Sequence, residues 1–120
     1  MENFASGSLR YYNDDMKRIK INTSSNKQIT IELEINNKII EKITSDSIVL
    51  RSEAAIPLID KILKNNNLEL KDLQEIEVFE GPGSYTGLRV GISIANALGF
   101  LLKIPVNGRK VGELASPVYN

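Results

Sequence analysis

The sequence predicts a single α/β domain in which a mixed β-sheet packs against helices. Three observations support this prediction: short alternating stretches early in the chain, two longer segments with helical apolar spacing, and a glycine-rich turn between a strand and a helix. The chain has 120 residues, a length typical of one domain. Acidic and basic side chains number 15 each, so a nucleic-acid or anionic-membrane surface of its own is not expected.

Three antiparallel strands are expected to open the domain, which we place at residues 16–120. The stretch KRIKIN alternates isoleucines with polar residues, and QITIELEI, residues 28–35, alternates more regularly. Asn36 and Asn37 both tolerate positive φ and predict a two-residue hairpin into a third strand, KIIEKIT. Residues 1–15 are polar and aperiodic, which predicts a flexible N-terminal extension.

The first helix is expected within SEAAIPLIDKILKNNN, where apolar residues recur at helical spacing. Ser52 is a candidate N-cap, and residues 65–67, all asparagine, are expected to end the helix. Proline is tolerated only near the first turn of a helix, so Pro57 predicts a helix that starts late or bends.

The second half of the chain predicts two α-crossovers to parallel strands. EIEVFE is expected to be a fourth strand, followed by a helix from about Thr86 to Lys103 and a fifth strand around Val106. A third helix is expected to begin at ELAS, residues 113–116. With right-handed crossovers, the order βββαβαβ is typical of the ribonuclease-H-like, actin-like (ASKHA) half-domain.

The residue types restrict the chemistry that the chain can perform. With no cysteine and no histidine, disulfides, thiolate nucleophiles, Ser-His-Asp triads and imidazole metal ligands are excluded, and no metal site is expected. Glu32 and Glu34 alternate with the apolar residues Ile31, Leu33 and Ile35, which predicts solvent-facing side chains and not a catalytic pair. The N-terminus has no apolar core of the length that a signal peptide needs, and the most apolar stretch, residues 92–102, is about half the length of a membrane span. A cytoplasmic protein without membrane contact is therefore expected.

The glycine turn GPGSYTGLRVG could hold an anion at the amino end of the second helix. It matches neither the P-loop nor the dinucleotide fingerprint, because Leu88 and Arg89 follow Gly87 and Thr86 stands at the last glycine position. The candidate anion or nucleotide loop comprises Thr23, Ser24, Gly83, Ser84, Thr86 and Arg89.

Small residues also recur at every fourth position of this helix and would let another backbone approach closely. Its other sides are mostly apolar, so contact with a partner is expected. The predicted interface comprises Ile59, Ile62 and Leu63 of the first helix with Gly87, Gly91, Ala95 and Gly99 of the second.

The segment GPGSYTGLRVGISIANALGFLLKIPV resembles the TsaB (YeaZ) family, whose members carry a GxGSFTGLRxG-type segment, a small-residue-rich helix and an (I/L)P(V/L) strand. Tyr85 replaces the phenylalanine. MKRIKINTSS takes the place of the family's opening strand and Asp-Thr-Ser loop, and SEAAIPLIDKIL resembles its first helix. The resemblance covers about residues 16–115.

The resemblance implies a fold of two actin-like halves, of which this chain would hold the first. It implies a non-catalytic scaffold for a TsaD-like enzyme that makes threonylcarbamoyladenosine on tRNAs reading ANN codons, with a TsaE-like ATPase assisting. The chain would form a homodimer in isolation, meet tRNA only indirectly and carry no cofactor, with ATP and metal on the partner subunits.

Two departures from the family pattern matter. Asn22 stands where actin-like ATPases have a metal-associated aspartate, and the second half of a usual family member is expected to be absent. TsaD-like proteins carry a histidine metal motif, so a chain without histidine is not expected to be that paralogue. Two alternatives stay open: a nucleotide-binding protein or ATPase of the actin-like fold, using the loop above, and a decayed remnant without a partner.

Overall fold

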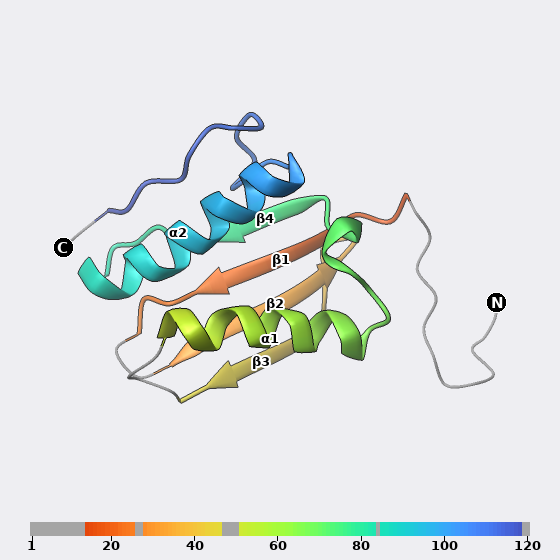
Figure 1. Cartoon of the computed structure of the whole chain (residues 1–120), viewed down its shortest axis with the longest axis horizontal. Helices are drawn as coiled ribbons and strands as arrows, with labels where there is room; N and C mark the ends of the chain where they lie inside the picture. The colour runs from red at the N-terminus through yellow and green to blue at the C-terminus, as the bar shows by residue number, and fades with distance from the viewer. Residues whose placement is uncertain (1–13, 26–27, 47–50, 84, 119–120) are drawn as a thin grey trace.

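The computed structural model describes residues 14–25, 28–46, 51–83 and 85–118. Figure 1 shows two layers, a twisted sheet and two long helices that both lie on one of its faces. Of the N-terminal extension, residues 1–13 lie outside the described residues, so the prediction of flexibility stays a prediction. Asp14 and Asp15 lead into the first strand, and the Asp15 carboxylate accepts a hydrogen bond from Asn36 Nδ2 at 3.1 Å.

Four strands form one mixed sheet in the order β3-β2-β1-β4. The predicted antiparallel meander is confirmed, with β1 (Lys17–Asn22), β2 (Ile29–Ile35) and β3 (Lys38–Ser45). Asn36 and Asn37 make its hairpin turn with φ values of 54° and 68°. The fourth strand, β4 (Glu75–Val78), pairs in parallel with β1, because a helix carries the chain back across the sheet.

The first helix, α1 (Arg51–Asn65), starts earlier than expected. Ser52 lies inside it and is not the N-cap, and Pro57 lies in the helix interior. Of the two predicted alternatives, the late start is therefore wrong, and the bend stays a prediction. Proline lacks the N–H that would bond to the carbonyl one turn earlier, which weakens the helix locally. Burial of Ala55, Ile59 and Ile62 against the sheet opposes that loss, because packing contributes more to helix stability than propensity does.

The predicted end of α1 among the asparagines is confirmed. Asn67 has a φ of 58°, its N–H donates to the Lys64 carbonyl, and the Leu68 N–H donates to the Leu63 carbonyl. This pattern is a Schellman motif with asparagine in the left-handed position. A short 3₁₀ turn, η1 (Leu70–Asp72), then leads into β4.

The predicted fifth strand is reduced to a single parallel bridge between Val106 and Ile76. Asn107 and Gly108 turn the chain away immediately, with φ values of 54° and 71°. The ELAS segment, expected to begin a third helix, has no regular structure over residues 113–116.

The second helix, α2 (Tyr85–Leu102), agrees with its predicted bounds to within one residue. Together with α1 it encloses a core on one face of the sheet. Neither helix of the described chain is long and apolar enough to cross a bilayer. The core side chains with the least exposure come from the sheet, from α1 and from α2: Ile19, Ile21, Ile29, Ile31, Leu33, Ala55, Ile62, Ile76, Leu88 and Ala95.

Candidate functional site

Two loops meet at the carboxyl ends of β1 and β4. A Cβ added to Gly83 would lie 3.3 Å from the Cβ of Ser24, so the glycine turn and the loop after β1 are in contact. The Ser24 N–H and hydroxyl both donate to Asn22 Oδ1, at 2.9 and 2.7 Å, and hold that loop closed. The structure therefore brings together Ser24 and Gly83 of the candidate anion loop. Ser84 lies outside the described residues.

The side chain of Thr23 is not free to bind an anion. It is 2% exposed, and its hydroxyl donates to the Gly87 carbonyl and accepts from the Gly91 N–H at 3.0 Å. Thr23 is therefore a structural contact to α2, which corrects its expected place in a ligand loop.

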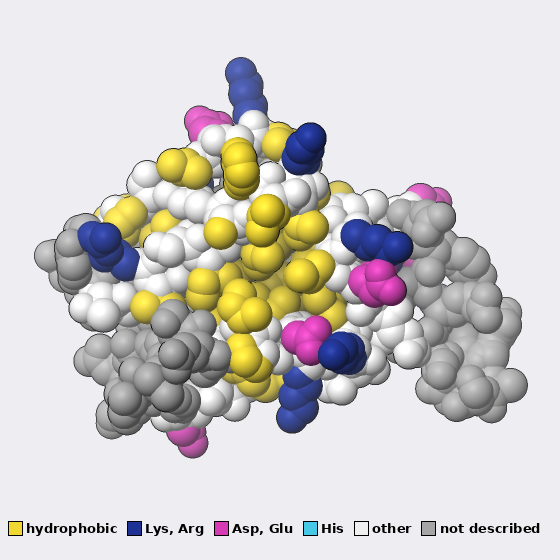
Figure 2. Space-filling model, in the orientation of Figure 1, with side chains coloured by type: hydrophobic (Ala, Val, Ile, Leu, Met, Phe, Trp, Pro, Cys, Tyr) yellow, Lys and Arg dark blue, Asp and Glu magenta, His cyan; other side chains and the backbone are white. Residues whose placement is uncertain are grey.

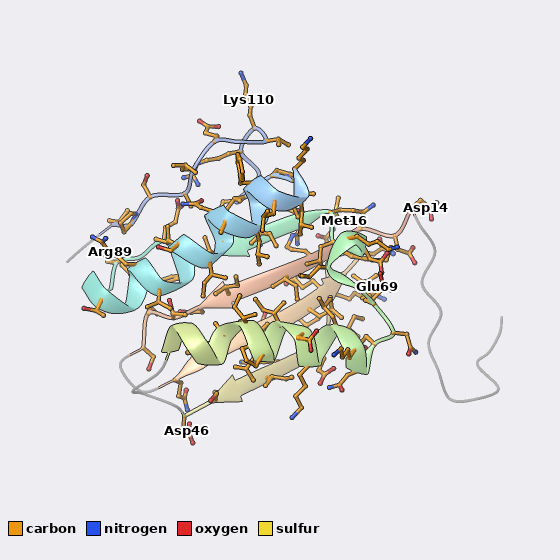
Figure 3. The ribbon with its side chains drawn as sticks, in the orientation of Figure 1. Asp14, Met16, Asp46, Glu69, Arg89 and Lys110 are labelled. Carbon is orange, nitrogen blue, oxygen red and sulfur yellow. The ribbon has the colours of Figure 1, made fainter. Side chains whose placement is uncertain are left out.

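The remaining candidates of the loop lie on the surface of α2. Thr86 and Arg89 are exposed, and Figure 3 shows Arg89 at the amino-terminal end of this helix. Backbone N–H groups of a helix start and one arginine could attract an anion electrostatically. The hydroxyl of Ser24 is already paired with Asn22, so the side chains supply few donors.

The row of small residues on α2 faces the chain's own sheet. A Cβ on Gly91 would lie 2.6 Å from Thr23 Oγ1, and one on Gly99 would lie 2.5 Å from Val106 Cγ2. Gly87 is buried and Ala95 has no exposed surface. The close approach predicted from these residues exists, but β1, Thr23 and Val106 make it, and a partner does not. This corrects their assignment to an interface.

The residues expected to form the α1 side of the interface are likewise in the core. Ile59, Ile62 and Leu63 are at most 2% exposed and pack over the sheet. The predicted helical stripe exists, but the surface that it meets is intramolecular.

A different set of apolar side chains reaches the surface on the two helices. Figure 2 shows hydrophobic side chains gathered in a continuous band on the helical face of the molecule. On α2, Val90 and Ile94 are half-buried and Leu101 is 72% exposed, while Ile56 of α1 is 49% exposed. Positions 90, 94 and 101 share one flank of a helix. We call these four residues the interhelical band.

The opposite face of the sheet is charged, and the sign alternates from strand to strand. β1 carries Arg18 and Lys20 between glutamates of β2 and β4. Arg18 forms ion pairs with Glu34 at 2.7 Å and Glu75 at 2.8 Å, and Lys20 pairs with Glu34 at 3.3 Å. Glu34 is only 7% exposed, so the expectation that it faces solvent is wrong: its two cationic neighbours cover it.

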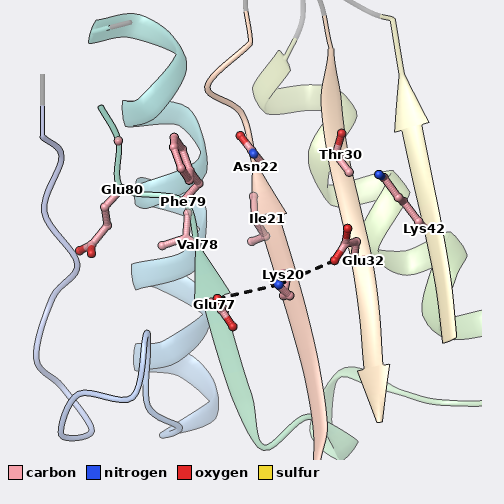
Figure 4. Close-up of a pocket in the computed structure, with 11 residues that line it drawn as sticks. Lys20, Ile21, Asn22, Thr30, Glu32, Lys42, Glu77, Val78, Phe79 and Glu80 are labelled. Atoms are coloured by element: carbon pink, nitrogen blue, oxygen red, sulfur yellow. Dashed lines mark ion pairs between the residues drawn. The ribbon is translucent and has the colours of Figure 1, made fainter. Parts of the chain in front are cut away.

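The ionisation of this face follows from the pairing. Burial would raise the pKa of Glu34, but hydrogen bonds and charges from Arg18 and Lys20 outweigh it and leave that pKa below the ordinary value. Figure 4 shows Lys20 between Glu77 and Glu32, at 4.0 and 3.9 Å, on the floor of a shallow hollow of about 450 Å³. Its mixed and mutually paired charges give no single-sign surface for an anion.

A C-terminal strap, residues 109–118, is tied to the domain by side chains that the sequence analysis did not identify. Asn96 on α2 accepts from the Ala115 N–H at 2.9 Å and donates to its carbonyl at 3.1 Å. Glu80 pairs with Arg109 at 2.8 Å and accepts from the Ser116 N–H at 2.9 Å. The polar Asn96 in a mostly apolar helix was the available signal for such a contact.

Known proteins resemble this chain both in sequence and in fold. The family model described as "TsaD: tRNA N6-adenosine threonylcarbamoyltransferase" matches residues 46–110, a little more than half of the chain. The Bacillus subtilis protein named "tRNA threonylcarbamoyladenosine biosynthesis protein TsaB" is 35% identical over 80 residues, which cover 58% of this chain and 35% of that protein. A protein of Nitrosospira multiformis named tRNA N6-adenosine threonylcarbamoyltransferase is 45% identical over 65 residues, covering 52% and 19%.

Among solved structures, YeaZ from Pseudomonas aeruginosa superposes with a TM-score of 0.70 at 21% identity, covering 79% of this chain and 44% of that one. The fold is therefore the ribonuclease-H-like, actin-like half-domain that the order of elements predicts. The chain spans less than half the length of these relatives. Its matches to TsaB proteins in sequence and to YeaZ in fold lead to one conclusion: the chain belongs to the TsaB/YeaZ family.

Proposed function

We propose that this chain is a non-catalytic subunit that binds a TsaD-like enzyme through the interhelical band during formation of threonylcarbamoyladenosine on tRNAs that read ANN codons. Family membership supports the pathway. The observation that carries the proposed role is the exposure of large apolar side chains on the helical face, with Leu101 72% and Ile56 49% exposed. Contiguous apolar surface of this kind is typical of a contact with another protein.

The residue types support the non-catalytic part of the proposal. The chain has neither histidine nor cysteine, and the neutral amide of Asn22 is a weak ligand for Mg²⁺ compared with a carboxylate. Its contribution would be binding energy that favours one conformation of the enzyme. In this proposal ATP and metal bind to partner subunits, a TsaE-like ATPase assists, and tRNA contacts the chain only indirectly.

Without its partner the band would be free to meet a second copy of itself. A twofold axis places the same patch on both subunits, so two bands would cover each other in a homodimer. We therefore propose that the homodimer and the complex with the TsaD-like enzyme use the same surface and exclude each other.

The decisive experiment places a charge in the band. Leu101→Lys would leave a charge without a partner in a desolvated contact, so binding to the organism's TsaD-like protein is expected to weaken by at least about 100-fold. Ile39→Lys is the matched control, since Ile39 is 58% exposed on β3 and outside the band. Binding is measured by calorimetry and threonylcarbamoyl transfer in the reconstituted complex. Equal binding by both variants would contradict the role of the band.

A nucleotide-binding role is the second candidate, and the contact between Ser24 and Gly83 is the observation that favours it. Calorimetry with ATP and Mg²⁺ separates the two. Submillimolar binding to the isolated chain would favour the nucleotide-binding role, whereas no heat at millimolar ligand would exclude it for this chain.

A further inference from the structure

The hydroxyl of Thr23 is inserted into the hydrogen-bond ladder of α2. It donates to the Gly87 carbonyl and accepts from the Gly91 N–H, two groups that lie four residues apart and pair with each other in a regular helix. Thr23 directly follows β1 and is 64 residues distant from Gly87 in sequence. One side chain therefore joins the end of a central strand to the second turn of the helix.

Glycine at position 91 is what makes room for this contact. A Cβ there would lie 2.6 Å from Thr23 Oγ1 and 3.3 Å from both Ile21 Cγ2 and Thr23 Cγ2. The 2.6 Å separation is far shorter than the normal approach of a carbon and an oxygen atom, and the two carbon–carbon separations of 3.3 Å are tight. Thr23 and Gly91 therefore act as a matched pair, and the position of α2 along β1 depends on both.

The pair lies between two parts of the proposed site. On one side Asn22 and Ser24 close the loop after β1, which touches the glycine turn at Gly83. On the other side Val90 and Ile94 of the interhelical band belong to the same turns of α2 as Gly91. A shift of α2 relative to Thr23 would move the band and the glycine turn together.

We propose that Thr23 is a positioning residue that couples the loop formed by Asn22, Thr23 and Ser24 and the glycine turn to the interhelical band. Its hydroxyl fixes α2 against β1 in the position that the partner binds. Coupling is reciprocal, so the partner, by holding α2, also orders the loop around Ser24 and Gly83. This inference rests on the proposed function for the identity of the partner, but its structural part concerns the free chain.

The test compares Thr23→Val, which keeps the shape and removes the hydroxyl, with Thr23→Ser, which keeps the hydroxyl. Thr44→Val is the matched control, because Thr44 is exposed on β3. The readouts are amide hydrogen exchange in the free chain at Gly91, Ser24 and Gly83, and the Kd for the TsaD-like partner.

Thr23→Val is expected to accelerate exchange at all three amides by about tenfold and to weaken partner binding by about tenfold, since two buried hydrogen bonds are lost. For Thr23→Ser and Thr44→Val, the exchange rates and the Kd should stay within about threefold of those of the unaltered chain. The loss of one hydrogen bond would change them by more than this. Faster exchange at Gly91 alone, with Ser24, Gly83 and the Kd unchanged, would overturn the proposal and leave Thr23 a local structural contact.

If Thr23→Val does not fold, the unaltered chain provides the test. Partner binding should then slow exchange at Ser24 and Gly83, although neither belongs to the band, and unchanged exchange there would overturn the coupling. If the unaltered chain does not bind the partner at all, the proposed function fails, while exchange in free Thr23→Val and Thr23→Ser still decides the coupling.

Discussion

The residues that pack beneath α2 explain why two of its positions are glycine. Gly91 and Gly99 stand where Thr23 and Val106 approach the helix, and each lacks the Cβ that would overlap those neighbours. In an exposed helix a glycine costs up to about 1 kcal/mol relative to alanine. At positions 91 and 99 a side chain would overlap its neighbours in the packed interior, and glycine avoids this overlap despite its lower helix propensity.

We predict that Gly91→Ala destabilises the fold by about 1–3 kcal/mol, since the overlap with Thr23 Oγ1 exceeds the gain in helix propensity. The neighbouring Ser93→Ala is the control, because Ser93 is exposed on the same helix and should change stability by less than about 0.5 kcal/mol. Urea denaturation gives both values. A Gly91→Ala chain as stable as the Ser93→Ala chain would show that Thr23 can move aside at little cost.

The same residues show the limit of sequence reasoning. Spacing of small residues at every fourth position predicts that something packs closely on α2, and that prediction is correct. It does not identify the neighbour, because Thr23 lies 68 residues before Gly91 and only the three-dimensional fold brings them together. The interface was therefore assigned to buried residues, while the exposed Leu101 and Ile56 were left unassigned.

At the scale of elements, the side chain of Asn107 covers the outer edge of β4 at the last residue of that strand. Asn107 accepts from the Val78 N–H at 2.7 Å and donates to the Val78 carbonyl at 3.0 Å, as a neighbouring strand would do. This side chain satisfies the polar groups of β4 where the fifth strand stops. Unpaired strand edges invite association with other chains, so the contact also protects the sheet.

We predict that Asn107→Gly lowers stability by about 1–2 kcal/mol, because glycine keeps the positive φ but loses both side-chain hydrogen bonds. Asn67→Gly is the matched control: Asn67 also has a positive φ, of 58°, and is exposed at the end of α1. Thermal unfolding should leave the control within about 0.5 kcal/mol of the unaltered chain. An equal effect at both positions would assign the loss to the backbone and not to the Val78 contact.

Local signals predicted most elements, and long-range contacts explain the failures. Alternation predicted the strands, and Asn36 with Asn37 predicted the hairpin, because the responsible residues are adjacent in sequence. The fifth strand failed for the opposite reason: Asn107–Gly108 turns the chain, and its role depends on Val78, 29 residues away. Pro57 predicted a late start or a bend in α1, and the late start is wrong because packing against the sheet outweighs the local preference.

At the scale of the whole molecule, the two faces of the sheet differ in chemistry. The helical face buries the core and also presents apolar side chains at its surface (Figure 2), while the other face carries ion pairs across β2, β1 and β4. Charges that already neutralise one another gain little from an apolar partner, because burying them would cost hydration. This asymmetry favours the helical face as the surface of the proposed contact with a TsaD-like enzyme.

The ion pairs on the charged face of the sheet should also make the stability of the fold depend on pH in the acid range. The folded-state pKa of Glu34 is lowered, so its contribution is fully present above the unfolded value near 4.5 and is lost as the pH falls through the lower folded value. The pKa of Glu80 is lowered as well: burial would raise it, but Arg109 and the Ser116 N–H prevail. Both carboxylates therefore predict a melting temperature that falls as the pH drops below about 4.5.

The variant Glu34→Gln separates the contribution that the ion pairs of Glu34 with Arg18 and Lys20 make to acid stability from the contribution of Glu80. The variant should melt at a lower temperature than the unaltered chain at pH 7, because Arg18 and Lys20 lose their shared partner. The two melting curves should converge as the pH falls from about 4.5 through the lowered folded-state pKa of Glu34, because protonated Glu34 resembles glutamine. Asp60→Asn removes a carboxylate from an exposed pair with Lys64 and should leave the pH profile nearly unchanged, since such pairs contribute little. Curves for Glu34→Gln and the unaltered chain that run parallel from pH 7 to pH 3 would mean that the charged face does not set the acid stability of this domain.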